Sequence, residues 1–314
     1  MKKEFRANGK LLLSGEYFVL DGAQALVMPL RYGQTMKVDN TGQDHILEWS
    51  AYVYGKPWFS AKFRRNDLEI LMTSEAGMAQ RLQMIFVQIA RMKPGIFTGK
   101  EGLKFRTDLE SNPEFGWGTS SSLISLLSQW AGINPYELYF SLWGGSAYDI
   151  AAATTETFFL YRCEKREPVV TKTFFSPSFA EDLFLVFLGK KQGSENEIRK
   201  YRDLPKPSLN AIKRISKISG SLPSARNLGE FEDMIIEHEK ILGYHLDRIT
   251  LKESMFPDYP GAVKSLGAWG GDFALFTSAD GKDSLESYLN KKGLNTWFRL
   301  GDLSPVTNDE RSLS

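Results

Sequence analysis

A short segment rich in glycine and serine leads directly into an apolar helical pattern, and it is the feature that most constrains this chain. Residues 116–122 read Gly-Trp-Gly-Thr-Ser-Ser-Ser. Apolar residues then recur at helical spacing and predict a helix over about residues 120–131, at Leu123, Ile124, Leu127 and Trp130. Glycines permit a tight turn before the helix, and the amide groups of a helix N-terminus attract anions. The segment therefore indicates a phosphate site, with a flexible turn and a serine N-cap as the alternative.

The overall charge of the chain is close to neutral. Its 314 residues include 39 Lys and Arg against 38 Asp and Glu, which gives a net charge of +1. A chain without a basic field has no bulk electrostatic reason to bind nucleic acid or an anionic membrane, so we expect neither as a partner. Any anion must then be bound by a local arrangement of groups.

Cysteine content and hydropathy indicate a cytoplasmic protein. The single cysteine, Cys163, can form neither an internal disulfide nor a paired metal site, which is usual in a reducing compartment. The longest strongly apolar run, Leu183–Leu188, is far shorter than the roughly 20 residues that a bilayer span needs. The N-terminal segment also has no small-residue cleavage site of the secretory kind.

Strand and helix patterns are mixed along the chain without strict alternation. Short strands are predicted in the first third, at Lys10–Leu13, Tyr17–Leu20, Thr35–Val38 and Ile46–Ser50. Helices are predicted over residues 78–92, 209–218 and 231–242. This mixture favours an α+β fold in two lobes over a doubly wound sheet.

One stretch of unusual composition marks the predicted domain boundary. Glu164–Ala180 is rich in charged residues, proline and serine, as linkers between domains often are. We therefore expect an N-terminal domain over residues 1–170, which contains the phosphate loop, and a C-terminal domain over residues 171–314.

Two further segments strengthen the interpretation of the glycine-serine loop. Residues 9–22 read GKLLLSGEYFVLDG, and residues 264–272 read KSLGAWGGD. With the loop at 116–122, they resemble the three signature motifs of the GHMP small-molecule kinases, which include mevalonate and phosphomevalonate kinases. The motifs occur in the family's order between about residues 5 and 280. The resemblance implies the two-lobed fold of that family, with a mixed α/β N-terminal lobe, a ferredoxin-like C-terminal lobe, and ATP and acceptor between them.

The resemblance also implies how ATP is bound. Carried over position by position, the phosphates of ATP would be wrapped by Gly116, Gly118, Thr119, Ser120 and Ser121. The hydroxyl of Ser120 would contact Mg2+. ATP and Mg2+ are therefore the expected cofactors.

A fourth segment resembles the acidic segment of the family and supplies the implied catalytic residue. It runs from Gly145 to Ala151 and contains Ser146 and Asp149. Asp149 would face the acceptor hydroxyl close to Lys10, whose positive charge would keep the pKa of that carboxyl low. These two residues are the implied catalytic pair.

The implied acceptor pocket draws on three parts of the chain. Ser146 and Glu16 would line it, and the third motif would form a small-residue loop in which backbone approaches the transferred phosphate, with Lys264, Gly267, Ala268 and Gly270. Mevalonate kinases of the family also place a Glu on Mg2+ about eleven residues before the Asp. That offset lands on Leu138 here, so the neighbouring Glu137 is either a metal ligand or a solvated helix residue.

Some positions depart from the family pattern. Trp117 and Trp269 stand where Leu and Gly are usual, so we expect bulk that reshapes the nucleotide or acceptor pocket. Tyr17 follows Glu16 where mevalonate kinases usually have His. A separate pair, His238-Glu239, suggests a zinc helix, but the required second histidine is replaced by Leu242, so we interpret the pair as part of an amphipathic seam.

The acceptor itself remains open at the level of sequence. The Gly-Glu-Tyr segment and the Gly-Gly-Asp ending resemble phosphomevalonate kinases, yet a phosphate acceptor is already ionised and needs no general base. The presence of Asp149 therefore favours an alcohol such as mevalonate. The sequence predicts an ATP-dependent kinase of the isoprenoid precursor pathway that acts on mevalonate or phosphomevalonate. The alternatives are a GHMP kinase for another small alcohol and a catalytically silent metabolite sensor; the oligomeric state is not predicted.

Overall fold

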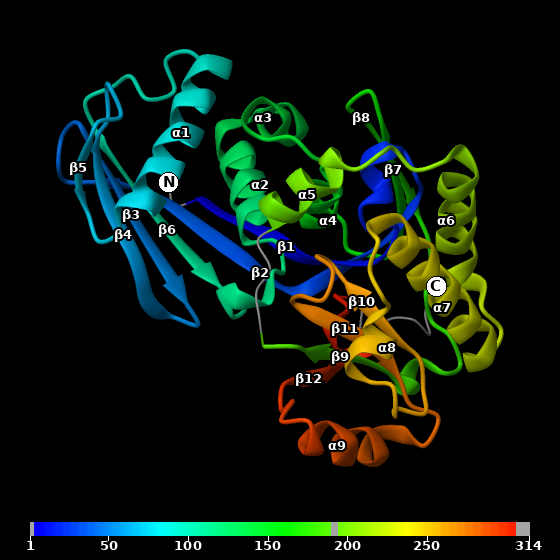
Figure 1. Cartoon of the computed structure of the whole chain (residues 1–314). Coiled ribbons are helices and arrows are strands. Elements are labelled where there is room, and N and C mark those ends of the chain that lie inside the picture. Colours follow the sequence, from blue (N-terminus) through cyan, green and yellow to red (C-terminus); the bar gives the residue numbers. More distant parts are fainter. Residues whose placement is uncertain (1–2, 190–193, 306–314) are drawn as a thin grey trace. The chain divides into compact units, whose positions relative to one another are not determined.

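Two long strands, β1 (Lys3–Ser14) and β2 (Ala25–Thr41), contribute residues to both of the compact units into which the chain divides (Figure 1). The computed structural model describes residues 3–189 and 194–305. Unit 1 comprises the described residues of Met1–Gly9, Tyr32–Pro113 and Trp117–Thr154. Unit 2 comprises those of Lys10–Arg31, Glu114–Gly116 and Thr155–Ser314.

The units are interleaved in sequence, whereas the predicted boundary was a single point at residue 170. The difference arises from the hairpin of β7 (Phe159–Glu164) and β8 (Glu167–Lys172). Residues 25–27 of β2 pair with β7, and β7 pairs with β8, so this hairpin belongs to unit 2. Amino-acid composition reveals the polar turn of a hairpin, but it does not reveal the strand with which the hairpin pairs.

Unit 1 contains a sheet with helices packed on it. Its strands follow the order β5-β4-β3-β6-β2 and are β3 (Ile46–Val53), β4 (Lys56–Arg64), β5 (Ile70–Thr73), β6 (Gly102–Leu109) and residues 34–41 of β2. The pairing of β3 with β6 is parallel and the others are antiparallel. Its helices are α1 (Ala76–Met92), α2 (Thr119–Ala131), α3 (Pro135–Leu142) and α4 (Tyr148–Thr154).

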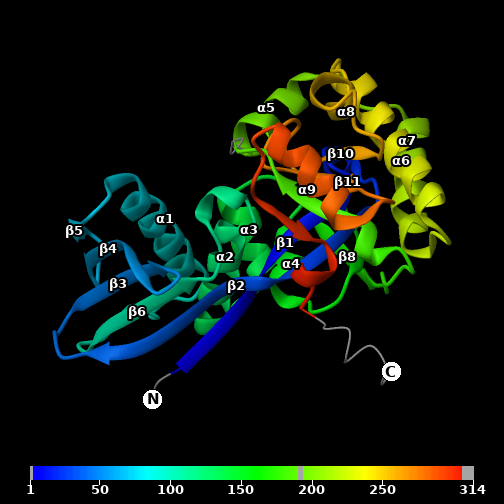
Figure 2. The same cartoon turned by 90° about the horizontal axis from the view of Figure 1, so that it is seen from below.

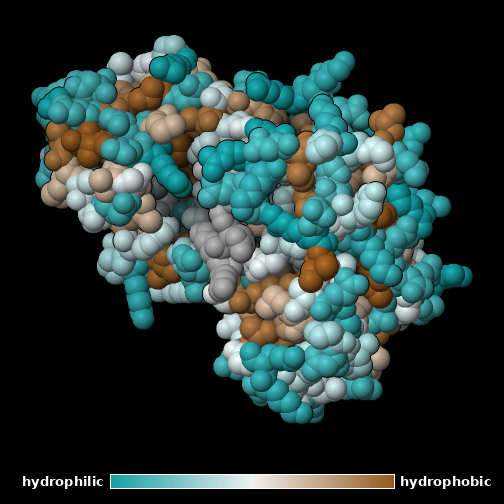
Figure 3. Space-filling view, viewed as in Figure 1, coloured by the Kyte–Doolittle hydropathy of each residue, from teal (hydrophilic) through white to brown (hydrophobic). Residues whose placement is uncertain are grey.

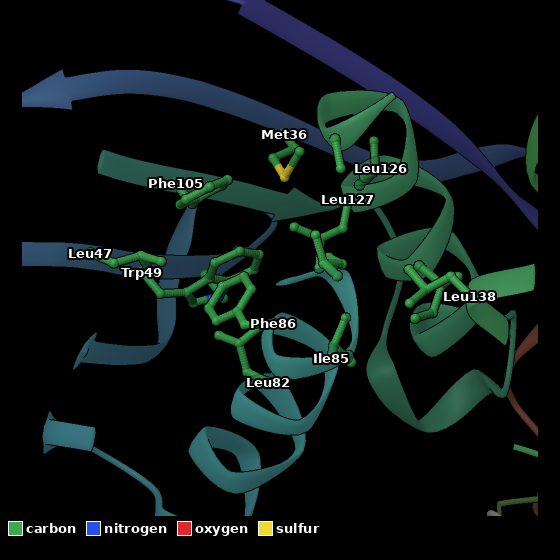
Figure 4. Packing of buried hydrophobic residues seen from close by; sticks show 14 of the residues in the cluster. Met36, Leu47, Trp49, Leu82, Ile85, Phe86, Phe105, Leu126, Leu127 and Leu138 are labelled. Carbon is green, nitrogen blue, oxygen red and sulfur yellow. The ribbon is translucent and has the colours of Figure 1, made fainter. Parts of the chain in front are cut away.

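The sheet and helices of unit 1 share one apolar core, shown in Figure 4. Trp49 of β3 and Phe105 of β6 stack with ring centroids 5.5 Å apart. Phe86 of α1 is fully buried and makes edge contacts with aromatic rings on several sides, including Trp49 and Phe63. Leu127 of α2 and Leu138 of α3 complete the same cluster. The apolar stripes that predicted α1 and α2 are therefore the faces that these helices turn to the sheet.

Unit 2 contains a second sheet in the order β10-β11-β9-β12, antiparallel throughout. Its strands are β9 (Leu183–Phe187), β10 (Val263–Leu266), β11 (Phe273–Thr277) and β12 (Trp297–Arg299). Between β9 and β10 the chain forms α5 (Ser194–Asp203), α6 (Leu209–Ser221), α7 (Leu228–Leu246) and α8 (Leu251–Met255). Helix α9 (Gly281–Lys291), labelled in Figure 2, follows β11 and precedes β12 along the chain. This is the βαββαβ order of a ferredoxin-like lobe, as expected, and the fold is α+β.

Short 3-10 helices join several of these elements. They are η1 (Phe18–Asp21), η2 (Pro113–Phe115), η3 (Ala180–Asp182), η4 (Leu222–Ser224) and η5 (Gly301–Leu303). The predicted strand at Tyr17–Leu20 is wrong, because Tyr17 lies in a turn and Phe18–Asp21 form η1. Gly15 and Gly22 on either side have φ of 92° and 87°, a left-handed conformation that turns the chain out of an extended path.

The visible face of the molecule in Figure 3 is mostly hydrophilic, with apolar patches among the charged residues. In unit 1, Leu71 and Met72 of β5 and Met84 of α1 are exposed. Single exposed apolar residues are common on folded proteins, so we assign these no function. In the described part of the chain, no helix is both long and apolar enough to cross a membrane.

Phe86 should be a major determinant of the stability of unit 1. Replacement by alanine deletes a fully buried ring and should lower the free energy of unfolding by about 3–5 kcal/mol. The matched control is Phe174→Ala, because Phe174 is 79% exposed and its removal should change stability by less than about 0.5 kcal/mol. Urea unfolding followed by circular dichroism measures both. Equal losses in the two variants would contradict the packing in Figure 4.

Candidate functional site

The N-terminus of α2 has a backbone geometry that suits an anion. Gly118 is the N-cap residue, with a left-handed φ of 90°, and Gly116 has a φ of 66°. Among the residues that the structure describes, no side chain caps this end of the helix. No side chain therefore occupies the N–H donors of the first turn, and the helix dipole places a partial positive charge beside them. The serine N-cap that was the alternative reading does not form.

The hydroxyl groups of this segment differ in their surroundings. Ser121 and Ser122 are buried, and the Ser121 hydroxyl donates to the carbonyl oxygen of Gly118 at 2.9 Å. The Ser122 hydroxyl lies 3.0 Å from the amide oxygen of Gln34. Ser120 is exposed. Of these three serines, Ser120 is therefore the one whose side chain is accessible to a ligand, and its contact with Mg2+ stays a prediction.

Asp149 lies in the first turn of α4, which packs on α2 within unit 1. Ile150 of α4 and Ile124 of α2 belong to the same buried cluster. The backbone bends sharply before α4: Gly145 has a φ of 144°, and Ala147 is left-handed with a φ of 60°. The packing of α4 on α2 thus brings the helix of the predicted catalytic carboxylate against the helix of the phosphate loop.

Two other predicted residues of unit 1 have contrasting positions. Ser146 is buried, with an exposed fraction of 6%. Glu137 is exposed in the first turn of α3, as the solvated-residue alternative predicted. Across residues 3–189 and 194–305, no group of three or more His, Cys, Asp or Glu side chains is placed to hold a metal ion. A Mg2+ ion bound to nucleotide phosphates needs only one or two protein ligands, so the exposed hydroxyl of Ser120 fits such an ion.

In unit 2, Glu16 and Lys264 form a buried ion pair. The Lys264 ammonium donates to Glu16 Oε1 and, at 2.8 Å, to the carbonyl oxygen of Ser265. The two side chains are 2% and 0% exposed. Burial raises the pKa of the Glu16 carboxyl, and the positive charge of Lys264 offsets part of that rise. Neither side chain reaches solvent, so the acceptor contact predicted for them does not fit; we infer that they position backbone instead.

Two residues of α7 complete this buried cluster. His238 Nε2 accepts the amide hydrogen of Gly15 at 2.8 Å, and Glu239 Oε1 accepts that of Ser265 at 3.1 Å. Burial lowers the pKa of His238 well below its usual value, so the imidazole is neutral. Burial raises the pKa of Glu239 to about 7, against the opposing charge of Lys264. Sequence reasoning missed both as positioning residues, although their spacing from Ile235 and Leu242 places all of these on one helix face.

The third motif forms a tight turn after β10. Gly267 and Gly270 are left-handed, with φ of 75° and 69°. The amide groups of Trp269, Gly270 and Gly271 donate within unit 2, to the Tyr17 hydroxyl at 2.8 Å, to the Ser265 hydroxyl at 3.2 Å and to the Ala268 carbonyl at 3.0 Å. Ala268 itself is buried. The turn is thus held in one shape by its own unit.

The two tryptophans that depart from the family pattern are packed inside their units. This corrects the expectation that they reshape a pocket. Trp117 is 5% exposed, and its ring stacks on Tyr32 with centroids 5.9 Å apart. Trp269 is 8% exposed and packs in a cluster with Tyr17 and Leu242. Gly243 of α7 is close enough that an added Cβ would lie 3.3 Å from the indole. Both side chains therefore stabilise the bases of their loops.

Within unit 2, Gly116 and Gly267 both lie near the Asp272 carboxylate. A Cβ added to Gly116 would lie 2.3 Å from Asp272 Oδ2, and one added to Gly267 would lie 4.0 Å from it. Gly116 therefore cannot be replaced by a larger residue without displacing this carboxylate. Lys10, the other predicted catalytic residue, lies on β1 and is half-buried.

The buried Glu239 makes a testable contribution to stability. Its carboxyl keeps a proton up to about pH 7 in the folded protein but releases it near pH 4.3 when unfolded. Between these values the folded state binds more protons, so this contribution is complete below about pH 4.3 and is lost as pH rises through 7. The loss is on the order of 3 kcal/mol. Glu239→Gln should remove it and retain an acceptor for Ser265.

Thermal unfolding at pH 5.5 and pH 8 measures this effect. The wild-type protein should lose more stability between the two values than Glu239→Gln does. Glu237→Gln is the matched control, since it makes the same change on the surface of the same helix and should keep the wild-type pH dependence. The same pH dependence in all three proteins would show that Glu239 is not protonated in the fold.

Comparisons with known proteins bear on this arrangement. No family model and no curated protein sequence matches the chain. Solved structures do. Phosphomevalonate kinase from Streptococcus pneumoniae, in complex with phosphomevalonate and AMPPNP, is 16% identical with a TM-score of 0.68, and the match covers 96% of this chain and 100% of that one.

Two further structures have the same fold. Mevalonate kinase from L. major, in complex with R-mevalonate, is 18% identical with a TM-score of 0.62, and the match covers 95% of this chain and 94% of that one. Galactokinase from Lactococcus lactis, complexed with galactose, is 13% identical with a TM-score of 0.65, and the match covers 95% and 92%. The resemblance read from the three motifs is confirmed in the fold, and the chain has the fold of the GHMP kinases.

Proposed function

We propose that this chain is an ATP-dependent kinase that phosphorylates mevalonate or phosphomevalonate. The observation that carries the proposal is the N-terminus of α2, which has no side-chain cap among the described residues, follows two left-handed glycines and packs beside the helix that bears Asp149. Structures with this fold include kinases in complex with each of these two acceptors or with galactose. We place the reaction in the cytoplasm.

The phosphate loop would bind ATP through its backbone. Gly116 and Gly118 allow the chain to wrap around the phosphates, and the first-turn amides of α2, from Thr119 to Ser121, would donate to their oxygens. The Ser120 hydroxyl would contact Mg2+, which supplies positive charge to the phosphates when it is bound. Phosphoryl transfer has a loose transition state, so such positioning and charge neutralisation account for most of the catalysis.

Asp149 and Lys10 would act on the acceptor. Asp149 would orient the acceptor hydroxyl and take its proton late in the transfer. Lys10 would supply a fixed positive charge that stabilises the transferred group. Ser146, next to the bend that begins α4, would contribute to binding the acceptor.

Two features favour different acceptors. Removing a proton from mevalonate, an alcohol, needs a base, and Asp149 supplies one. Phosphomevalonate presents an ionised phosphate that needs none, yet Tyr17 and Asp272 follow the phosphomevalonate kinase pattern. The proposal therefore names two alternative acceptors, which an assay can distinguish.

A coupled assay of ADP release should show Mg-ATP-dependent turnover of mevalonate or phosphomevalonate. The panel should also include homoserine and galactose, acceptors of other kinases with related motifs. Turnover of homoserine or galactose, without turnover of mevalonate or phosphomevalonate, would contradict the proposed acceptor. It would support a kinase for another small alcohol. Binding of ATP without turnover of any acceptor would contradict the kinase and support a silent metabolite sensor.

Asp149→Asn should separate the two acceptors. For mevalonate, loss of the base should lower kcat by about 10²–10⁴-fold with little change in the KM for ATP. For phosphomevalonate the loss should be much smaller, because no proton has to be removed. Asp233→Asn, an exposed position on α7, is the matched control and should keep full activity. Full turnover of mevalonate by the Asp149 variant, with wild-type circular dichroism, would exclude the base role.

A further inference from the structure

We propose that Tyr17 is a positioning residue, whose hydroxyl holds the amide of Trp269 and so sets the shape of the turn Gly267–Gly271. This inference rests on the proposed function and on the role that the GHMP resemblance implies for the third motif, whose backbone would approach the transferred phosphate. Tyr17 lies in the first sequence motif and Trp269 in the third, so the contact joins two motifs that are distant in sequence.

The hydroxyl of Tyr17 uses both of its hydrogen-bonding capacities. It accepts the amide hydrogen of Trp269 at 2.8 Å, and it lies 3.4 Å from Glu197 Oε2, to which it donates. Burial raises the pKa of the Tyr17 hydroxyl, so it keeps its proton throughout the neutral range. A phenylalanine at this position would keep the ring and lose both bonds.

Glu197 of α5 is itself fixed in place. Its Oε2 accepts from Arg248 Nη1 at 3.1 Å, and its Oε1 accepts from Lys200 Nζ at 2.7 Å. The residue is 6% exposed. Burial acts to raise the pKa of Glu197, but the bonds and charges of Lys200 and Arg248 outweigh it and lower the pKa. The carboxylate is therefore ionised at neutral pH, and it orients the Tyr17 hydroxyl so that its lone pair faces Trp269.

The backbone and ring of Tyr17 are also constrained. Its φ is 59°, a left-handed value that a non-glycine residue adopts only where its surroundings hold it. The amide of Gly15 is bonded to His238, and the Tyr17 ring packs 5.3 Å from the ring of Tyr201. The hydroxyl is thus delivered to the turn by a buried and rigid side chain.

The shape of the turn decides which amides a phosphate would meet. The amides of Trp269, Gly270 and Gly271 are engaged within unit 2. In the described part of the chain, those of Gly267 and Ala268 have no such bond. The Tyr17 contact therefore divides the turn into an anchored half and a half whose donors remain for a ligand.

The other end of the turn has separate anchors. Lys264 is paired with Glu16, and the amide of Ser265 is bonded to Glu239. These contacts do not involve the Tyr17 hydroxyl. Removing that hydroxyl should therefore loosen the turn at Trp269 and leave the strand before it in place.

The test is Tyr17→Phe, with Tyr201→Phe as its matched control. Tyr201 belongs to the same apolar cluster, and its hydroxyl bonds Asp21 at 2.6 Å rather than the turn. Hydrogen–deuterium exchange at residue resolution should show the Trp269 amide exchanging about tenfold faster in Tyr17→Phe and at the wild-type rate in Tyr201→Phe. The amide of Ser265 should be unchanged in both.

The kinetic readout distinguishes positioning from a structural role. Well below the melting temperature, Tyr17→Phe should lower kcat by about tenfold with less than about a twofold change in the KM for ATP, and Tyr201→Phe should not change kcat. Unchanged exchange at Trp269, or faster exchange with an unchanged kcat, would overturn the inference. Failure of the proposed function is recognised separately, because the wild-type protein itself would then turn over no acceptor.

Discussion

The buried ion pair between Glu16 and Lys264 is the interaction on which the arrangement of unit 2 depends. It joins residues 248 positions apart, and both charges are removed from water. Each is tolerated only because the other is present, and removal of one partner from such a pair typically costs about 3–5 kcal/mol. Since Glu16 adjoins Tyr17 and Lys264 precedes the turn Gly267–Gly271, the pair and the tyrosine contact bind the first and third motifs into one structural element. The first and third motifs are separate in sequence, but each of them helps to determine the backbone geometry of the other.

In unit 1 the candidate phosphate site depends on backbone groups and not on a buried ion pair. With 39 positive and 38 negative side chains there is no basic field to hold a phosphate. The N-terminus of α2 offers backbone dipoles instead, which need no desolvation of a charged side chain. Such donors exist only while the helix is formed and its end is not capped. The packing of α2 on the sheet and on α4 therefore determines the geometry of this candidate site, and the apolar face of α2 matters as much as its glycines.

Periodicity predicted those parts of the fold where burial alone decides the structure. The helices α1, α2, α6 and α7 follow apolar stripes several turns long, so their existence and type could be read from sequence. The segment of residues 17–20 is too short for a helical period to be distinguished from a strand period. The left-handed glycines on both sides favour a 3-10 helix there. The interleaving of the two units depends on the pairing of β2 with both β6 and β7. Pairing over such separations leaves no local sequence signal.

In the candidate site, too, features set by local interactions could be predicted from sequence, and features set by distant interactions could not. The glycine turn and the start of α2 were predictable because they lie within a few residues of each other, and local chemistry determines both. The roles of Glu16 and Lys264 were misassigned because two charged residues in motifs suggest contact with a ligand, and only the fold shows them paired and buried. His238 and Glu239 did carry a signal: ionisable groups at positions that continue an apolar stripe must find partners inside the protein. A polar residue on a buried helix face therefore indicates a partner elsewhere in the chain, and here the partners are the backbones of the two motifs.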